Sequence, residues 1–480
     1  MLLIGLLAVI SIVAATALVP AHDLSVAIHE ISTHTPMELV RHAERRLVGH
    51  PKLETLASPA LRLIRSVEER GAPAAPLPDL GKGQRAAGLT TTSYDASGRP
   101  VPALPLSAAV ISVSATRTIH DIKELRQALA SAKAGDVIEA APGTYQVTTA
   151  LHTAAGGAAN QPITLRARQT GTVLFEVRSV EGFVVSHPYW VFENLNWRGV
   201  CANHSNCEHA FHVVGTARGT IIRNNRLEDF NAHVKVNGED GQWPDDGMLQ
   251  YSSLINRMPR QTENPVTPFD LVAANGWQVL DNLVENFVKA NQSPSYGIFM
   301  KGSSQGGLIA RNVVICSLST SPVPGLRVGI SLGGGGTDTA SCRDGSCSFE
   351  HSLGTVANNV IAHCNDFGID VAHSTKNTIA FNTLVNTEGI DLRRPPSSAS
   401  VFGNLIEGRI RQRNGAEGQE EDNLIKRSLD SLLASPDRLD LRWLQTPPWV
   451  ATRPAVPTDF CGRVRGTLSP VGATVNPQCP

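Results

Sequence analysis

The sequence predicts an all-β solenoid, a parallel β-helix, and three observations lead to this fold class. Seven short segments, each ending in Asn or once in Ser, recur with spacings of 27, 30, 30, 47, 23 and 22 residues from position 225. A strand-like segment with two alternating apolar positions lies between successive members of this set. The 480 residues include 41 Gly and 30 Pro with few aromatic residues, which favours a turn-rich β protein over a helical bundle. A period in the twenties indicates stacked coils.

The first 110 residues are predicted to precede the solenoid. Residues 2–19 carry no charge and have the pattern of an export signal, with a cut after Ala17 or Ala21. The run is also just long enough to stay as a membrane anchor, so a cleaved signal and an anchor both remain open for residues 1–21. Residues 22–110 are predicted as a helical extension followed by an Ala- and Pro-rich linker. The expected location is periplasmic or secreted.

The eight cysteines fit export to an oxidising compartment. Three pairs are close in sequence and are predicted to clip loops: Cys201/Cys207, Cys342/Cys347 and Cys461/Cys479. The repeat phase places the remaining two, Cys316 and Cys364, on neighbouring coils, although buried free thiols are an alternative for them. No CxxC pair occurs, so a zinc site is not expected.

The solenoid is predicted to begin at about Ile111 and to continue, with a C-terminal tail, to residue 480. A capping-box-like start at Asp121 and Glu124 opens a short helix. The helix and the following segment, Ala134–Tyr145 with the sequence AGDVIEAAPGTY, resemble the opening of right-handed parallel β-helix proteins of the pectate-lyase-like superfamily. The resemblance implies that the helix caps one end of the solenoid. Near the end of the chain, a further helix is predicted at about Leu429–Leu433.

The recurrent Asn residues are predicted to be structural. Asn tolerates the left-handed backbone of a tight bend, and its amide can bond the Asn of the next coil. The aligned positions are Asn225, Ser252, Asn282, Asn312, Asn359, Asn382 and Asn404.

The strands between these bends are aligned by their inward apolar pairs. The seven pairs are Phe211/Val213, Val234/Val236, Phe269/Leu271, Ile298/Met300, Ile330/Leu332, Ile369/Val371 and Ile390/Leu392. Because side chains alternate along a strand, the residue within each pair points outward. That outward row is His212, Lys235, Asp270, Phe299, Ser331, Asp370 and Asp391. The next row is Val214, Asn237, Val272, Lys301, Gly333, Ala372 and Arg393.

The outward rows carry the predicted site. The charges nearly balance, with 42 Lys and Arg against 43 Asp and Glu, so no overall field would attract nucleic acid. The groups suit β-elimination on an acidic, uronate-containing polysaccharide, in which a cation neutralises the carboxylate while a base removes the C5 proton. Lys235 or Lys301 would neutralise, and His212 or His233, which is also expected to point outward, would be the base. Asp270, Asn237 and Arg393 would bind substrate, and loops Gly238–Asp246 and Thr262–Thr267 would flank the site.

A second resemblance concerns catalysis. The segment Phe299–Ser304 is similar to the catalytic Lys strand of polysaccharide lyases of the alginate lyase and chondroitinase B kind, and Gly325–Gly329 is similar to their Arg segment. The resemblance implies that Lys301 is the base and Arg327 its helper. That family places acidic calcium ligands before the Lys, but here Asn291–Tyr296 contains no acid. The ligand pattern therefore does not support calcium, and the cofactor is left open.

Three alternatives accompany the lyase hypothesis. A uronate C5-epimerase uses the same proton abstraction, and a non-catalytic glycan-binding or structural β-helix would use the same cations without cleavage. The charged row could also be an ordinary solvated face. The acid pair Asp245/Asp246 resembles what an inverting glycosidase needs, but it is interpreted as a turn.

Overall fold

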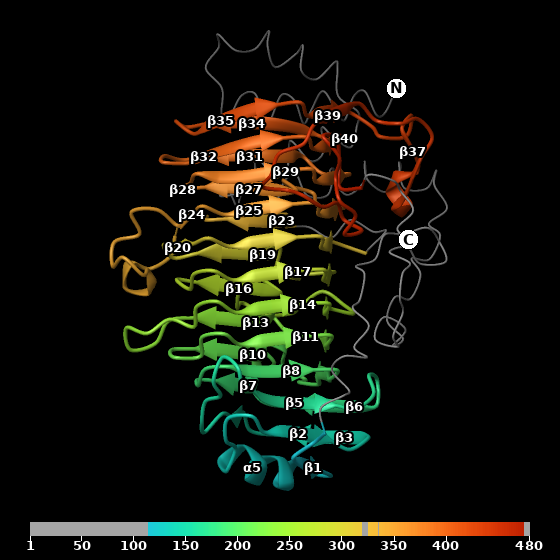
Figure 1. The fold of residues 1–480 in the computed structure, drawn as a ribbon. Coiled ribbons are helices and arrows are strands. Elements are labelled where there is room, and N and C mark those ends of the chain that lie inside the picture. The colour runs from blue at the N-terminus through green and yellow to red at the C-terminus, as the bar shows by residue number, and fades with distance from the viewer. Residues whose placement is uncertain (1–113, 319–324, 335, 475–480) are drawn as a thin grey trace. The chain divides into compact units, whose positions relative to one another are not determined.

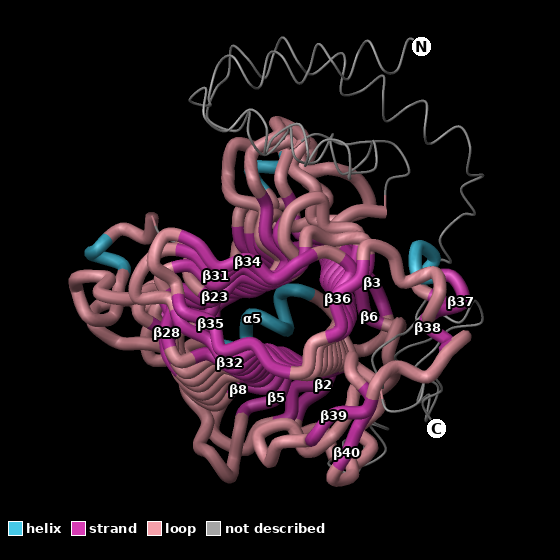
Figure 2. Tube along the Cα trace, turned by 90° about the horizontal axis from the view of Figure 1, so that it is seen from above, coloured by secondary structure: helices cyan, strands magenta, loops and turns pink. Residues whose placement is uncertain are grey.

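The chain winds into stacked coils, each built from short parallel strands that form the walls of a solenoid (Figures 1 and 2). The structure is a computed structural model that describes residues 114–318, 325–334 and 336–474. The predicted export segment, helical extension and linker lie outside these residues. The predicted right-handed parallel β-helix is confirmed.

Three parallel sheets make the walls. Sheet I has twelve strands, which are β1 (Arg117–Ile119), β2 (Val137–Ala140), β5 (Ile163–Ala167), β8 (Trp190–Glu193), β11 (Ile221–Arg223), β14 (Met248–Gln250), β17 (Gln278–Leu280), β21 (Leu308–Ala310), β25 (Thr355–Ala357), β29 (Asn377–Ala380), β32 (Ser398–Phe402) and β35 (Glu417–Glu421). Sheet II has ten, which are β4 (Leu151–His152), β7 (Glu181–Val185), β10 (His209–Val214), β13 (Ala232–Asn237), β16 (Phe269–Val272), β19 (Ser295–Lys301), β23 (Arg327–Leu332), β27 (Ile369–Ala372), β31 (Gly389–Arg393) and β34 (Arg409–Arg413). Sheet III has eleven, which are β3 (Gly143–Val147), β6 (Val173–Val177), β9 (Asn196–Gly199), β12 (Arg226–Glu228), β15 (Ser253–Ile255), β18 (Leu283–Glu285), β22 (Val313–Ile315), β26 (Val360–Ala362), β30 (Thr383–Val385), β33 (Leu405–Glu407) and β36 (Leu424–Lys426).

Smaller elements decorate the coils. A three-stranded parallel sheet joins β20 (Ser304–Gln305), β24 (His351–Ser352) and β28 (Ser374–Thr375). Two antiparallel pairs follow the last coil, β37 (Leu433–Ser435) with β38 (Asp440–Trp443) and β39 (Trp449–Ala451) with β40 (Leu468–Pro470). In the part of the chain that the structure describes, the 3-10 turns are η4 (His204–Asn206), η5 (Thr339–Ser341) and η6 (Pro436–Arg438).

Helix α5 (Ile122–Ala130) lies at the N-terminal end of the solenoid. Figure 2, which looks along the solenoid axis, shows it at the centre of the coils. The predicted cap forms, because the Asp121 carboxylate accepts a hydrogen bond of 2.8 Å from the Glu124 amide. Leu125, Ala128 and Leu129 are the buried residues of α5 and form one apolar face. This apolar face covers the interior of the first coils, which would otherwise be open to water.

The solenoid interior is filled by the predicted inward pairs of sheet II and by their counterparts on the other sheets. Both members of all seven pairs are almost completely buried. Large aromatic side chains fill the early coils, where the rings of Phe175 and Trp197 stack with centroids 4.2 Å apart. Smaller aliphatic pairs such as Ile390 and Leu392 fill the late coils.

The predicted Asn ladder runs between sheets I and III. The Asn312 side-chain amide donates to the Asn359 Oδ1 at 2.9 Å, and its own Oδ1 accepts from the Asn282 backbone and side chain. Ser252 occupies the slot predicted for it, and Asn423 extends the ladder beyond Asn404. The left-handed backbone belongs to the preceding residue instead, such as Asp281 with φ of 56°. The Asn therefore satisfies the bend without itself adopting the strained conformation.

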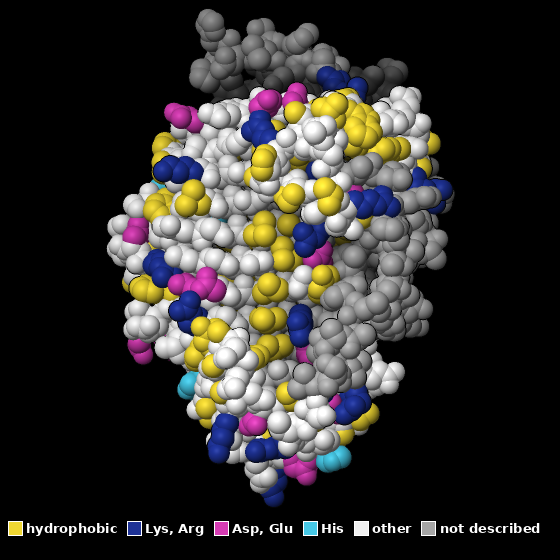
Figure 3. Space-filling view, viewed as in Figure 1, with side chains coloured by type: hydrophobic (Ala, Val, Ile, Leu, Met, Phe, Trp, Pro, Cys, Tyr) yellow, Lys and Arg dark blue, Asp and Glu magenta, His cyan; other side chains and the backbone are white. Residues whose placement is uncertain are grey.

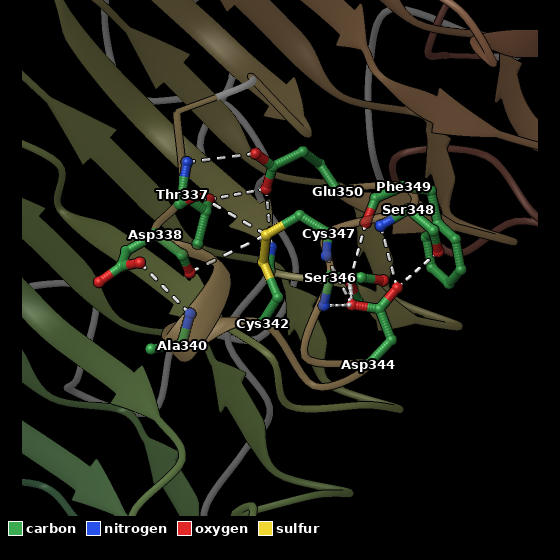
Figure 4. Close-up of a disulfide and its surroundings, with 12 residues drawn as sticks. Thr337, Asp338, Ala340, Cys342, Asp344, Ser346, Cys347, Ser348, Phe349 and Glu350 are labelled. Atoms are coloured by element: carbon green, nitrogen blue, oxygen red, sulfur yellow. Dashed lines mark hydrogen bonds between the residues drawn. A yellow bond between two sulfur atoms is a disulfide. The ribbon is translucent and has the colours of Figure 1, made fainter.

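The predicted pairing holds for three disulfides, Cys201–Cys207, Cys316–Cys364 and Cys342–Cys347. Cys461 is also disulfide-bonded, whereas Cys479, its predicted partner, lies outside the described residues. The Cys342–Cys347 bond closes a loop in which the Asp344 carboxylate accepts hydrogen bonds from the backbone amides of residues 346, 347 and 348 (Figure 4). The loop is thus ordered by its own polar contacts.

The C-terminal tail packs back onto the coils. Buried Arg465 donates to the Asn358 Oδ1 at 2.7 Å and lies over the Phe381 ring at 4.0 Å. The prediction of a helix at Leu429–Leu433 is wrong. Instead, the Leu429 carbonyl accepts from the amides of Leu432 and Leu433, which closes a turn that leads into β37.

Charges of both signs are interspersed on the face of the solenoid drawn in Figure 3, as the near-zero net charge leads one to expect. Pairs such as Arg311 with Asp281 (2.7 Å) link neighbouring coils of sheet I. Among the described residues, no helix combines the length and apolarity needed to cross a membrane.

Candidate functional site

The outward rows predicted for sheet II are confirmed in register. His212 pairs with Lys235, Lys235 with Asp270, and Asp270 with Phe299 on consecutive strands. Lys301 lies one register over, beside Val272. Because parallel strands stack at about 4.8 Å, these side chains form continuous columns along the solenoid.

The side chains of the outward row of sheet II are less exposed to solvent than the alternation of the strands predicts. Asp270, Asp370 and Asp391 point outward but are at most 5% exposed. Longer basic side chains from adjacent strands and registers cover them. The face therefore has two layers, carboxylates below and ammonium or guanidinium groups above, which the period-two argument alone does not predict.

The centre of this face is a carboxylate shared by two lysines. The Lys235 Nζ lies 2.5 Å from the Asp270 Oδ2, and the Lys301 Nζ lies 3.5 Å from the Oδ1. Burial acts to raise the pKa of Asp270, but Lys235 and Lys301 outweigh it and hold that pKa below its ordinary value. The Lys301 ammonium also sits 4.3 Å from the centre of the Phe299 ring. Both cations keep about a fifth of their side chains exposed, so a ligand can reach them.

His212 lies one strand away and is held at both ring nitrogens. Its Nδ1 is 2.5 Å from the Glu181 Oε1, and its Nε2 is 2.6 Å from the Asn237 Oδ1. The Asn237 amide nitrogen donates to the Gly238 carbonyl, which orients the Oδ1 toward the histidine. An oxygen atom on either side of the ring therefore fixes the orientation of His212. The hydrogen bond from His212 lowers the pKa of Glu181.

Three further groups belong to this cluster and were not predicted. Glu181 is on β7, and His209 and Glu208 lie at the start of β10. Burial raises the pKa of Glu208, and burial lowers the pKa of His209 to about 4. The sequence contains a pattern that would have predicted the coil with Glu181. Phe183 and Val185 repeat the apolar pair of Phe211 and Val213 and pair with them in register, which brings Glu181 opposite His209.

The expectation that His233 faces solvent is wrong. His233 is fully buried, with its Nε2 3.2 Å from the Ile255 carbonyl and its ring against Phe230. Burial lowers its pKa to about 3. It is the second residue of β13, and its side chain packs against Phe230 and the end of β15. His233 is therefore not positioned to act on a ligand of this face.

Arg327 and Lys301 are not brought together. Arg327 begins β23 and pairs with Ser295, the first residue of β19, whereas Lys301 is the last. Six residues of strand separate the two positions, about 20 Å at the usual rise. Arg327 is also buried. The expected partnership is wrong because the two strands are parallel and in register, with Arg327 at the start of β23 and Lys301 at the end of β19.

Arg393 lies on the same face but pairs with a different carboxylate. Its guanidinium makes a two-pronged contact with Asp370 at 2.9 and 2.7 Å. Arg411 and Arg413 likewise cover Asp391. This second group lies on β27, β31 and β34, several coils from Asp270.

The loop that contains Asp245 is fixed beside the sheet by a long-range ion pair. The Arg343 guanidinium, from the disulfide-closed loop, contacts both Asp245 oxygens at 2.7 and 2.9 Å. It also stacks on Trp243 at 4.5 Å. Asp245 is thus a structural acid, in agreement with its interpretation as part of a turn. Two loops from separate coils are joined in this way.

The comparisons with known proteins agree with this geometry at the level of the fold. A chondroitinase B family model matches residues 119–239, less than half of the chain. The solved structure of pectate lyase Pel9A covers 76% of this chain and 98% of its own, with 12% identity and a TM-score of 0.53. The fold is that of the parallel β-helix polysaccharide lyases. A rhamnogalacturonan lyase covers 65% of this chain and 87% of its own, with 15% identity and a TM-score of 0.47. No curated protein matches the sequence.

The matched segment has a bearing on the site. Residues 119–239 include Glu181, His212, Lys235 and Asn237, but not Lys301. Of the two lysines of the pair, only Lys235 therefore lies within the segment that matches the chondroitinase B family model.

Proposed function

We propose that this chain is a polysaccharide lyase that cleaves an acidic, uronate-containing glycan by β-elimination on the outer face of sheet II. One observation carries the proposal. Lys235 and Lys301 reach the same buried carboxylate from the two strands that flank it, so that group of three carries one positive charge in excess. An accessible, fixed cation pair is what a uronate carboxylate and the charge that grows on it require.

Each group has a role in this scheme. Lys235 and Lys301 bind the uronate carboxylate and neutralise it as the C5 proton leaves. His212 exchanges that proton, with Glu181 holding its Nδ1–H as a carboxylate does in catalytic dyads. Because the His212 Nε2 contacts the Asn237 Oδ1, substrate must displace that amide before this nitrogen can take the C5 proton. Electrons from the broken C5–H bond form the C4–C5 double bond, the C4–O bond breaks, and the leaving oxygen takes a proton from solvent.

The assay follows the ultraviolet absorbance of the unsaturated uronate with alginate, pectate and glycosaminoglycans as substrates. Lys235→Ala should lower kcat/KM by about 100-fold, the usual effect of removing one fixed electrostatic stabiliser. The matched control is Lys376→Ala, an exposed lysine away from the site. Absence of product from every polymer would refute the lyase.

The same samples decide among the alternatives. Exchange of the C5 proton with deuterated water, without a drop in polymer length, would identify a C5-epimerase. Binding without exchange or cleavage would identify a glycan-binding protein. If Lys235→Ala, Lys301→Ala and His212→Ala all cleave as the wild type does, the enzyme uses another face.

We further propose that the protein is exported, which the described disulfides support because such bonds persist in oxidising compartments. The N-terminal sequence of the protein recovered from the periplasm and the medium tests this. A start at residue 18 or 22 is expected for a cleaved signal, and an intact N-terminus in the membrane fraction would indicate an anchor instead.

A further inference from the structure

Beside the lysine pair, three side chains form a cluster that the elimination scheme does not fully use. Glu181 on β7 and His209 and His212 on β10 each offer one ligand atom, and these three atoms lie within 4.8 Å of one another. The residues come from adjacent strands, since Glu181 pairs directly with His209 in register. Two strands of a solenoid wall hold such atoms with little freedom to separate.

Both imidazoles are oriented as metal-ligating histidines are. The His209 Nδ1 contacts the Ala232 carbonyl at 3.2 Å, which leaves its Nε2 as the nitrogen available to a ligand. The His212 Nε2 contacts the Asn237 Oδ1, which leaves its Nδ1 toward Glu181. A metal-bound histidine usually donates its other ring N–H to a carbonyl or carboxylate, because that contact fixes the tautomer and the ring. His209 is 9% exposed and Asn237 is half-buried, so these supports are built into the fold.

We propose that Glu181, His209 and His212 form a binding site for a divalent transition metal of the zinc type. Two imidazole nitrogens and one carboxylate oxygen are a ligand set that zinc uses with one position left open. Imidazole ligands select against calcium, which prefers six or more oxygens. On binding, the metal takes the place of the hydrogen in the contact between the His212 Nδ1 and the Glu181 Oε1, and that proton goes to solvent.

The site would bear on the proposed function without depending on it. His212 pairs in register with Lys235, so an ion held there lies next to the lysine pair, and its open position could take a uronate oxygen. That consequence rests on the proposed function, whereas binding of the ion itself does not.

The test measures binding rather than activity. The full-length protein is stripped with a chelator and titrated with Zn²⁺ by calorimetry, and with Co²⁺ while its visible d–d bands are recorded. One ion per chain is expected, with the intense bands of four-coordinate Co²⁺. Glu181→Gln, which keeps the size of a partly exposed side chain, should weaken binding by at least about tenfold, and His209→Gln by at least as much.

The controls are His120→Ala, an exposed histidine near the capping helix, and a titration with Ca²⁺. His120→Ala should bind Zn²⁺ as the wild type does, and Ca²⁺ should not compete. Equal Zn²⁺ binding by all variants, no binding by the wild type, or preference for Ca²⁺ would overturn the site. Circular dichroism identifies a variant that fails to fold, and Asn237→Ala then provides the independent case, with an expected loss of about tenfold. His209 has no role in the elimination scheme, so loss of Zn²⁺ binding by His209→Gln with lyase activity intact would leave the proposed function standing.

Discussion

At the scale of single residues, Asp270 decides the electrostatics of the candidate site. It is buried, yet the ammonium groups of Lys235 and Lys301 hold its pKa below the ordinary value against the effect of burial. Without this carboxylate the two lysines would face each other across one strand. Their repulsion would drive the side chains apart and into solvent. Asp270 therefore both fixes the cations and depends on them.

Asp270→Asn should lower the free energy of unfolding by about 2 kcal/mol at pH 7, between the values for exposed and for fully buried pairs. A carboxyl whose folded pKa is lowered stabilises the fold above its unfolded pKa, near 4, and loses that contribution as the pH falls through the lowered folded pKa. The difference between wild type and variant should therefore shrink below about pH 4. Urea unfolding at pH 7 and at acid pH measures it. A difference that stays constant would contradict the assignment.

At the scale of elements, the Asn ladder joins the turns between sheets I and III. Asn312 is fully buried, and its side chain makes hydrogen bonds with residues of both the preceding and the following coil. Each rung satisfies backbone groups that have no strand partner at the bend. The ladder thus replaces, at the corners, the hydrogen bonds that the sheets supply along the walls.

Asn312→Ala should cost about 3 kcal/mol, because it leaves several buried donors and acceptors unpaired at once. Asn423→Ala is the matched control at the end of the ladder, where the side chain is half-buried, and about 1 kcal/mol is expected there. Both are read from urea unfolding followed by circular dichroism. Equal losses at the two positions would show that the ladder is not the source of the stability.

The disulfide-closed loop is the second element whose attachment to the solenoid can be tested. Arg343 holds it to Asp245 with two parallel hydrogen bonds, a geometry that lysine cannot reproduce. Arg343→Lys should speed amide hydrogen exchange in residues 338–348 several-fold and leave the sheet II strands unchanged. Exposed Arg178→Lys serves as the control, measured by the same mass spectrometry. Unchanged exchange in the loop would mean that the disulfide and Asp344 order it alone.

At the scale of the whole solenoid, each coil contacts its neighbours, and the C-terminal tail adds contacts that reach back over many residues. Arg465 donates to Asn358, which is 107 residues earlier. Burial lowers the pKa of Arg465 to about 10, so the guanidinium remains charged at neutral pH. The tail thereby covers part of the late coils, where Leu432, Leu433 and Phe460 pack on the outside of sheet III.

Arg465→Met keeps the apolar stem and removes the donors, and it should cost about 3 kcal/mol, since buried acceptors lose their partner. Limited proteolysis should cut the tail first, while circular dichroism keeps its β signature. Arg453→Met is the control, because Arg453 also stacks on a Phe ring but pairs with the exposed Glu421, and less than about 1 kcal/mol is expected. Cooperative loss of the whole fold without early cleavage of the tail would contradict the idea that Arg465 mainly attaches the tail.

The sequence by itself determined the coils. Recurrent Asn residues and the alternation of inward pairs fixed the register of sheet II from β10 to β31, and with it the neighbours His212, Lys235 and Asp270. These are local patterns, and a one-residue slip would turn every apolar side chain outward, so the pattern leaves one solution. The same reasoning applied one coil earlier, at Phe183 and Val185, would have added Glu181.

Only the tertiary structure decided which outward side chains are accessible. His233 has the parity of Lys235 but is buried against Phe230 and the Ile255 carbonyl, whereas Lys235 keeps access to solvent. Likewise Arg327 follows Lys301 in sequence but begins its strand at the opposite end. Period and spacing give the direction in which a side chain points. Its burial and its ion-pair partners depend on the residues packed against it, and many of those residues are distant in the sequence.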